Sequence, residues 1–178
     1  PDGSFDNSFI IGSGFSNGPF NCATGNIVIF ASEKLLITGT FISYNGTNCE
    51  ICRLNSDGTY DSTSNYGNFN NYDDSFNEFV SINDLKIQSD GKILAGGNFT
   101  HYNGTARRKI VRINNDGIID NTFSIGNGFN DTVTTLSIQS DGKIIVGGSF
   151  TSYNGSTTNR IIRLNINGTK DNTFNIGS

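Results

Sequence analysis

Three acidic residues in one segment are the first candidates for chemistry. Asp73, Asp74 and Glu78 lie in NYGNFNNYDDSFNEF, which runs from Asn65 to Phe79. Two carboxylates that flank a sugar bond can hydrolyse it as a pair. A solvated acidic loop explains the same residues more simply, and no nucleophile with a neighbouring base can be named elsewhere. We therefore expect no catalytic residues and keep a polysaccharide-acting enzyme as a distant alternative.

Metal ligands are the second chemistry that the residue types could support. Cys49 and Cys52 form half of a zinc motif, but no second pair and no suitable histidine follow. Boxes of the form Asn-x-Asp-Gly-x-x-Asp hint at calcium but lack the further acids of a chelating loop. We expect no metal and no cofactor. A bridge from Cys22 to either of the other cysteines and three free thiols both stay open.

Composition and charge indicate many short strands and exclude some partners. The 178 residues include 22 Gly and 14 Phe, with only 2 Pro, which suits strands joined by tight turns. The net charge of −4 would repel phosphate backbones. No apolar run approaches the roughly 20 residues that span a bilayer. We expect no nucleic acid partner and no membrane insertion. The lack of methionine indicates a processed product or an excerpt.

One sequence motif occurs three times in similar form. It reads SEKLLITGTFISYNG at 32–46, DGKILAGGNFTHYNG at 90–104 and DGKIIVGGSFTSYNG at 141–155. A second motif, of the type RLNSDG, follows each copy of the first. The period of about 50 to 60 residues means that each repeat is one supersecondary unit that stacks on its neighbours.

Four strands can be predicted within the clearest repeat. We name them by their order as a, b, c and d: Val133–Gln139, Lys143–Phe150, Arg160–Asn165 and Thr169–Phe174. Glycine turns join a to b and c to d, which predicts two hairpins. The b–c and d–a connections vary more, so loop function is expected on their rim.

The length of the turns can be tested by the side chains that it brings together. A three-residue loop ending in glycine places Arg112 opposite Asp120, and it places Ile138 opposite Ile144 in the other hairpin. The same rule predicts two further structural pairs, Arg53 with Asp61 and Arg163 with Asp171.

Four antiparallel strands at this period are typical of a β-propeller blade, with a β-sandwich or β-solenoid as the alternative. The string R-L-N-x-D-G-x-x-D-x-x-F, a loop with GNGF, and SIQSDGKIIVGGSFTSYNG resemble the delta-60 repeat family of unknown function. The first copy departs from it, because Glu33 stands where Gly91 and Gly142 stand. The resemblance implies propeller blades in long arrays, in bacterial surface proteins or phage structural proteins, with no known catalytic residues.

The chain is therefore expected to be one all-β repeat domain, 1–178. Residues 1–9 would be the last strand of a preceding blade, and blades one to three would cover 10–66, 67–123 and 124–178. Three blades are too few to close a propeller. We expect part of a larger propeller, or closure with another chain, so further copies of the repeat are expected partners.

Binding residues are expected on the rim of the b–c and d–a connections. Their aromatic and basic side chains suggest a platform for a glycan or a protein surface, although each repeated tyrosine could instead fix its own turn. The candidates are Tyr44, Tyr102, Tyr153, Tyr66, Phe69, Tyr72, Arg107 and Arg108. The expected function is a non-catalytic scaffold and recognition segment of an extracellular or cell-surface protein. The alternative is a structural part of a phage virion.

Overall fold

The computed structural model describes residues 4, 6–71 and 80–175. Every regular element in these ranges is a β-strand. They contain no helix of the length and apolar character that a membrane crossing needs. The all-β class expected from the composition is confirmed.

Each repeat builds one main sheet of three antiparallel strands, with the b strand in the middle. The strands of the first repeat are β2 Thr24–Ile29, β3 Leu35–Gly39 and β6 Ile51–Leu54. Those of the second are β8 Ser81–Ile87, β9 Ile93–Asn98 and β12 Ile110–Ile113. Those of the third are β13 Val133–Ile138, β14 Ile144–Gly148 and β17 Ile161–Leu164.

The b–c connection of each repeat forms a small hairpin of its own. These hairpins are β4 Ser43–Tyr44 with β5 Thr47–Asn48, β10 His101–Tyr102 with β11 Thr105–Ala106, and β15 Ser152–Tyr153 with β16 Ser156–Thr157. In the first two repeats a short strand from the d–a connection joins them: β1 Phe15–Ser16 pairs with β4, and β7 Phe69–Asn70 pairs with β10. Asn-Gly sits at each tip with both φ angles positive, for example 49° at Asn103 and 75° at Gly104. Such angles define the tight hairpin turn that Asn-Gly favours.

The predicted hairpin registers are confirmed. Ile138 lies opposite Ile144 and Leu136 opposite Val146 in the a–b hairpin. In the c–d hairpin Ile113 lies opposite Ile119, and the Asp120 N–H donates to the Arg112 carbonyl at 2.9 Å.

The predicted fourth strand, Thr169–Phe174, is wrong as a strand. It is reduced to one bridge, Leu164 with Lys170. Immediately after that bridge the Asp171 carboxylate accepts the N–H and the hydroxyl of Thr173, at 2.9 and 2.7 Å. This local turn competes with a sheet ladder and ends the pairing.

The turn that Glu33 placed in doubt has the same form as its counterparts. The Glu33 N–H donates to the Phe30 carbonyl, as Gly91 and Gly142 donate to Gln88 and Gln139. Glu33 adopts a φ of 61°, a left-handed conformation that costs a residue with a side chain more than it costs glycine.

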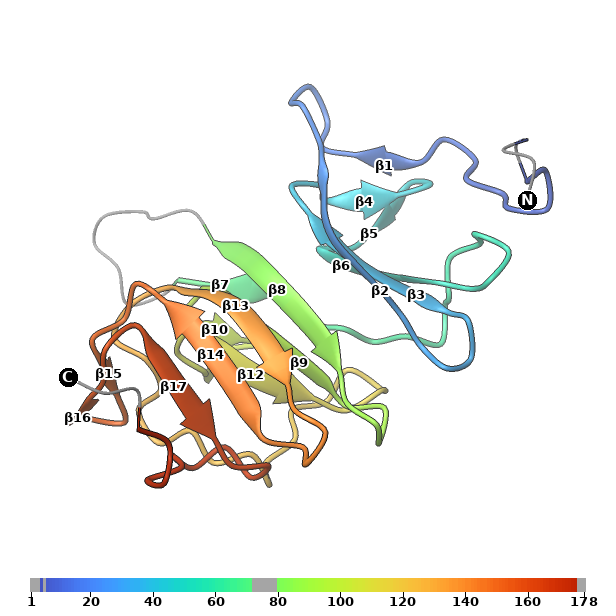
Figure 1. Ribbon diagram of the computed structural model, residues 1–178. Helices are drawn as coiled ribbons and strands as arrows, with labels where there is room; N and C mark the ends of the chain where they lie inside the picture. The colour runs from blue at the N-terminus through green and yellow to red at the C-terminus, as the bar shows by residue number, and fades with distance from the viewer. Residues whose placement is uncertain (1–3, 5, 72–79, 176–178) are drawn as a thin grey trace.

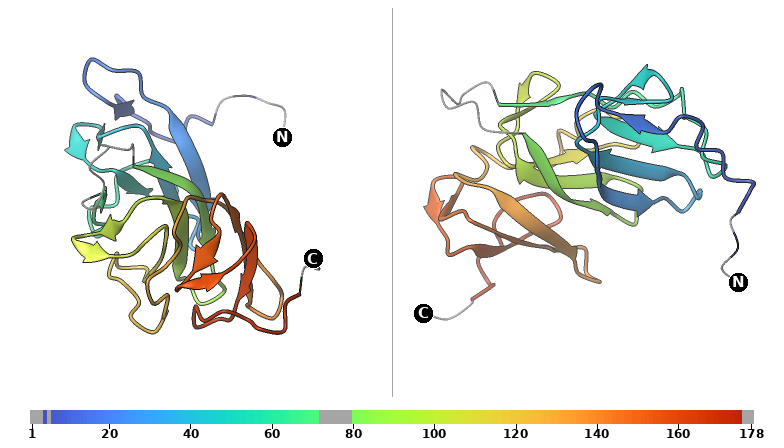
Figure 2. Two further views of the ribbon diagram at one scale, coloured as in Figure 1. Left: turned by 90° about the vertical axis from the view of Figure 1, so that its left-hand side faces the viewer. Right: turned by 90° about the horizontal axis from the view of Figure 1, so that it is seen from above.

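Neighbouring sheets meet through their first strands and bury the core between them. β2 lies against β8, and β8 lies against β13. Figure 1 shows the three sheets following one another, with the first and last described residues at opposite ends. The array stays open, because in the described part of the chain the first and third sheets each pack on the second and not on one another (Figure 2). The chain thus forms three propeller-like repeats that do not close a ring, and the residue boundaries assigned to the blades stay a prediction.

Candidate functional site

The predicted arginine–aspartate pairs form in all three repeats. The arginine Nε donates to the aspartate Oδ2 at 2.7 Å from Arg53, 2.8 Å from Arg112 and 2.7 Å from Arg163. A lysine immediately before strand b, which the sequence analysis missed, also contacts each aspartate: Lys34, Lys92 and Lys143, at 2.7, 3.1 and 3.0 Å. The recurrence of a lysine directly after each a–b turn is the sequence signal that could have predicted this contact.

The aspartates of these clusters are strongly favoured as anions. Burial opposes the charge of Asp120, but hydrogen bonds from Thr122 and Lys92 and the charge of Arg112 outweigh it. The pKa of Asp120 therefore lies well below its usual range. The pKa of Asp61 is also lowered, because hydrogen bonds and the charge of its arginine outweigh the effect of burial there too. The pKa of Asp171 is lowered as well, and the hydrogen bonds from Thr173 are the largest cause.

Two of the three arginines also connect neighbouring repeats. Arg53 Nη1 donates to the Asn115 carbonyl at 2.6 Å, and Arg112 Nη1 donates to the Ile166 carbonyl at 2.5 Å. Both acceptors lie in the c–d turn of the following repeat, 62 and 54 residues away. One guanidinium thus fixes its own hairpin and the position of the next sheet.

The repeated tyrosines do not form the expected open platform. Tyr44, Tyr102 and Tyr153 are 1%, 0% and 2% exposed. Their hydroxyls donate to the carbonyl of the glycine in the c–d turn of the same repeat, Gly58, Gly117 and Gly168, at 2.7, 2.8 and 2.6 Å. Burial raises the pKa of Tyr102 to about 12. This geometry favours the simpler interpretation, in which each phenol fixes its own turn.

A phenylalanine ahead of each strand a completes an aromatic cluster in each repeat. Phe69 lies 4.6 Å from Phe99 and 4.9 Å from Tyr102, measured between ring centroids. Phe15 and Phe129 hold the equivalent places. Phe69 is 4% exposed, so its ring is a core group and not the ligand contact predicted for it. The Gly-x-Gly-Phe sequence before strand a was the signal for Phe15 and Phe129.

The remaining aromatic candidates are Tyr66 and Tyr72. Tyr66 is half-buried, its hydroxyl donates to the Asn115 carbonyl at 3.2 Å, and the Arg53 guanidinium lies 5.6 Å from its ring centroid. It therefore supports the contact between the first two repeats. Tyr72, and the acids Asp73, Asp74 and Glu78, lie outside the described residues.

The basic cluster of the second repeat is divided between surface and interior. Arg108 is exposed, and Arg107 is half-buried with Nη2 3.1 Å from Asn121 Oδ1. Lys109, the third member, is 7% exposed and its Nζ donates to Asn98 Oδ1 at 2.5 Å. Of these three basic residues, the two arginines reach the surface and the lysine does not.

The described residues contain no cluster of three or more His, Cys, Asp or Glu that could hold a metal ion. The aspartates that hinted at calcium have local partners, since Asp116 Oδ1 accepts the Ile118 N–H at 2.9 Å. Cys22, Cys49 and Cys52 are free thiols.

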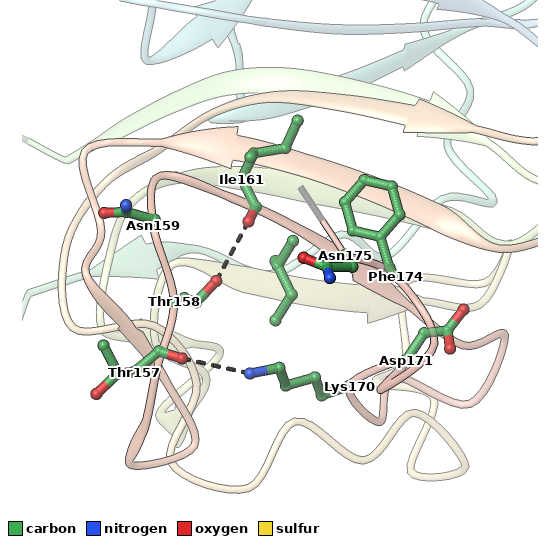
Figure 3. A pocket seen from close by; sticks show the side chains of 9 residues that line it. Thr157, Thr158, Asn159, Ile161, Lys170, Asp171, Phe174 and Asn175 are labelled. Atoms are coloured by element: carbon green, nitrogen blue, oxygen red, sulfur yellow. Dashed lines mark hydrogen bonds between the residues drawn. The ribbon is translucent and has the colours of Figure 1, made fainter. Parts of the chain in front are cut away.

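A cavity of about 340 Å³ lies at the outer face of the third repeat. Figure 3 shows it between the end of the β15–β16 hairpin and the segment after the c–d turn. Thr158 Oγ1 donates to the Ile161 carbonyl at 3.2 Å, and Lys170 Nζ donates to the Thr157 carbonyl at 3.3 Å. Phe174 closes one side of it.

The geometry defines the class of protein. Three stacked sheets with the same internal ion pairs and the same buried tyrosine make a repeat protein of the β-propeller type. The family model described as domain of unknown function (DUF5122) beta-propeller matches residues 33–63, 88–123 and 139–174, more than half of the chain. The chain belongs to this family. Neither the comparison with curated proteins nor that with solved structures finds a match.

Proposed function

We propose that the chain is a non-catalytic propeller scaffold that presents its b–c hairpins to a protein surface. The observation that carries this proposal is the division between shared and variable residues. The arginines, aspartates, lysines and tyrosines that recur in all three repeats serve internal contacts. The hairpin tips at 45–48, 103–106 and 154–157 are exposed, and after their shared Asn-Gly the residues differ between the repeats.

The charge next to the tips changes from repeat to repeat. Cys49-Glu50 follows the first tip, Arg107-Arg108 the second and Thr158-Asn159-Arg160 the third. A rigid scaffold with varied loops is a common arrangement for binding. Charges on such a rim steer association and select partners more than they add affinity.

A glycan is the second candidate ligand. The segment from Asn65 to Phe79 is rich in aromatic and carboxamide residues, which suit sugar rings and hydroxyls. The burial of Tyr102 and Phe69 argues against stacking on those two rings. Location outside the cell, and the alternative of a phage virion, stay predictions from the family resemblance.

The proposal can be tested with poly-glutamate as a model acidic partner and with an array of neutral and acidic glycans. The net charge of −4 opposes a polyanion as a whole, so binding of poly-glutamate would have to come from the local pair of arginines. We expect such binding, and we expect Arg107→Gln with Arg108→Gln to weaken it about tenfold. Arg160→Gln removes one exposed charge from the third repeat and is the control for the single changes Arg107→Gln and Arg108→Gln, each of which also removes one charge. Binding of neutral glycans that survives the double change would favour the glycan, and release of reducing sugar from polysaccharides would contradict a non-catalytic role.

A further inference from the structure

Two cysteines of the first repeat lie in contact with each other. Cys49 directly follows β5, and Cys52 is the second residue of β6. Both side chains pack in the core cluster of the first repeat, where Cys52 is fully buried and Cys49 is half-buried. The two side chains are hydrogen-bonded to each other. The third cysteine, Cys22, is exposed, and its thiol donates to the Phe15 carbonyl at 3.5 Å.

A shorter connection brings these two residues together. Cys49 is equivalent to Arg107, because the N–H of each makes the same hydrogen bond across the b–c connection, at 2.9 and 2.8 Å. Cys52 is equivalent to Val111, since each directly precedes the arginine of strand c. Three residues separate Arg107 from Val111, and one of them, Lys109, is left-handed with a φ of 66°. Only two residues separate the cysteines, and neither has a positive φ.

Only one of the two thiols is open to solvent. Cys49 lines a cavity of about 310 Å³ together with Glu50 and Tyr60, whereas Cys52 is fully buried. The hydrogen bond from Cys52 lowers the pKa of Cys49 against the effect of burial, and the Tyr44 N–H lowers it further. The same contact, together with burial, raises the pKa of Cys52. Because the thiolate is the attacking form of cysteine, Cys49 is suited to react first and Cys52 to follow.

The fold itself does not depend on sulfur at these two places. The third repeat has Thr158 and Ile162 there, and it keeps the same backbone hydrogen bond and the same strand pairing. The first repeat therefore carries two adjoining thiols that its sheet does not need. One of them is accessible and the other is buried beside it, which is the arrangement of an attacking and a resolving cysteine.

We propose that Cys49 and Cys52 form a redox-active pair, which hydrogen peroxide oxidises to a disulfide and small thiols reduce again. The Cys49 thiolate attacks one oxygen of the peroxide, so that an S–O bond forms, the O–O bond breaks and hydroxide leaves. The Cys52 sulfur then attacks the Cys49 sulfur, and the sulfenic hydroxyl leaves as the S–S bond forms. The protons of the two thiols complete two waters. Two electrons pass from the sulfurs to the peroxide.

The disulfide closes a short loop between the first hairpin and strand c. Two molecules of a small thiol reopen it by exchange and leave as their own disulfide. Glu50 lies inside this loop, next to the exposed tip at 45–48, so the bridge constrains the part of the rim that carries the charge of the first repeat. Oxidation of the pair does not depend on binding at the rim.

The test treats the reduced chain with an equimolar amount of hydrogen peroxide and maps its thiols by mass spectrometry. We expect Cys49 and Cys52 to be lost as thiols and Cys22 to remain. Because Glu50 lies between the two cysteines, cleavage after Glu50 gives two peptides that only the disulfide joins. Dithiothreitol should restore all three thiols.

The other repeats supply matched variants, since Cys52→Val and Cys49→Thr introduce the residues found at the equivalent places. In Cys52→Val the reaction should stop at the sulfenic acid of Cys49, so that dimedone labels this residue about tenfold more than in the unchanged chain. Cys49→Thr should form no disulfide, and Cys22→Ser should leave the bridge unchanged. Urea unfolding of the reduced variants checks that they are folded.

Three outcomes would overturn the inference. The first is survival of all three thiols, and the second is a bridge in which Cys22 is the main partner. The third is equal dimedone labelling of Cys49 in the unchanged chain and in Cys52→Val, since Cys52 would then not resolve the sulfenic acid. None of these measurements involves poly-glutamate, so this proposal and the proposed function fail separately.

Discussion

Arg112 and Arg163 hold the same position in successive repeats, yet their surroundings differ. Arg112 Nη1 bonds the Ile166 carbonyl of the next repeat, and Arg112 is almost fully buried. Arg163 keeps the aspartate pair at 2.7 Å but is more exposed. The pair within a repeat is therefore a local feature, whereas the burial of the arginine depends on the next sheet.

The largest expected effect comes from removing the inner arginine. Arg112→Ala leaves the buried Asp120 with fewer partners and the Ile166 carbonyl without its donor, so we expect a loss of about 3–5 kcal/mol. Arg163→Ala should cost about 1 kcal/mol, because solvent can replace part of its contacts. Urea unfolding measures both, and equal losses would contradict the distinction between inner and outer arginines.

The apolar faces offer a matched comparison. Leu136 is 2% exposed against the second repeat, whereas its equivalent Ile27 is 54% exposed on the first. We expect Leu136→Ala to cost about 3 kcal/mol through the cavity that it leaves. Ile27→Ala should cost less than about 1 kcal/mol. A similar midpoint shift in the two variants would show that Ile27 is covered in solution.

The tyrosine hydroxyls test the links between hairpin and turn. The Tyr102 hydroxyl donates to the Gly117 carbonyl and accepts the Gly67 N–H at 2.9 Å. Tyr102→Phe should cost about 1–2 kcal/mol, because both backbone groups lose a partner. Tyr153→Phe is the control, since its hydroxyl bonds the Gly168 carbonyl alone among the described residues. Thermal unfolding should rank Tyr102→Phe as the more harmful, and the reverse order would refute this account.

Acid should weaken the clusters in a predictable direction. The pKa of Asp120 is lowered in the folded state, so its contribution is complete above the unfolded pKa of about 3.9 and is lost as the pH falls further. We expect a constant urea midpoint down to about pH 5 and a steady fall below about pH 4. Asp120→Asn should flatten that fall. A midpoint that rises toward acid pH would contradict the assignment.

The smallest effect concerns the first a–b turn. Glu33→Gly should stabilise the chain by up to about 1 kcal/mol by relieving the left-handed backbone. Gly91→Glu, at an equivalent position with open space around it, should destabilise it by a similar amount. Calorimetry of the two variants checks the signs, and two shifts of the same sign would count against this explanation.

Much of each repeat could be predicted because hairpins are local. The glycine at the end of a three-residue turn fixes which residues face each other, so Arg112 with Asp120 and Ile138 with Ile144 followed from spacing alone. The fourth strand could not be predicted in this way. The aspartate that ends the hairpin binds its own Thr122 or Thr173, and this local turn outweighs further pairing.

The sequence by itself determined the repeat, the turn lengths and the ion pairs within each hairpin, because these join residues fewer than about ten positions apart. Only the tertiary structure decided where the remaining donors go. It directs Arg53 and Arg112 to carbonyls 62 and 54 residues away, and it turns the tyrosine rings inward, away from the predicted rim. Such contacts depend on how one sheet lies on the next, and the spacing of residues within a single repeat carries no information about that.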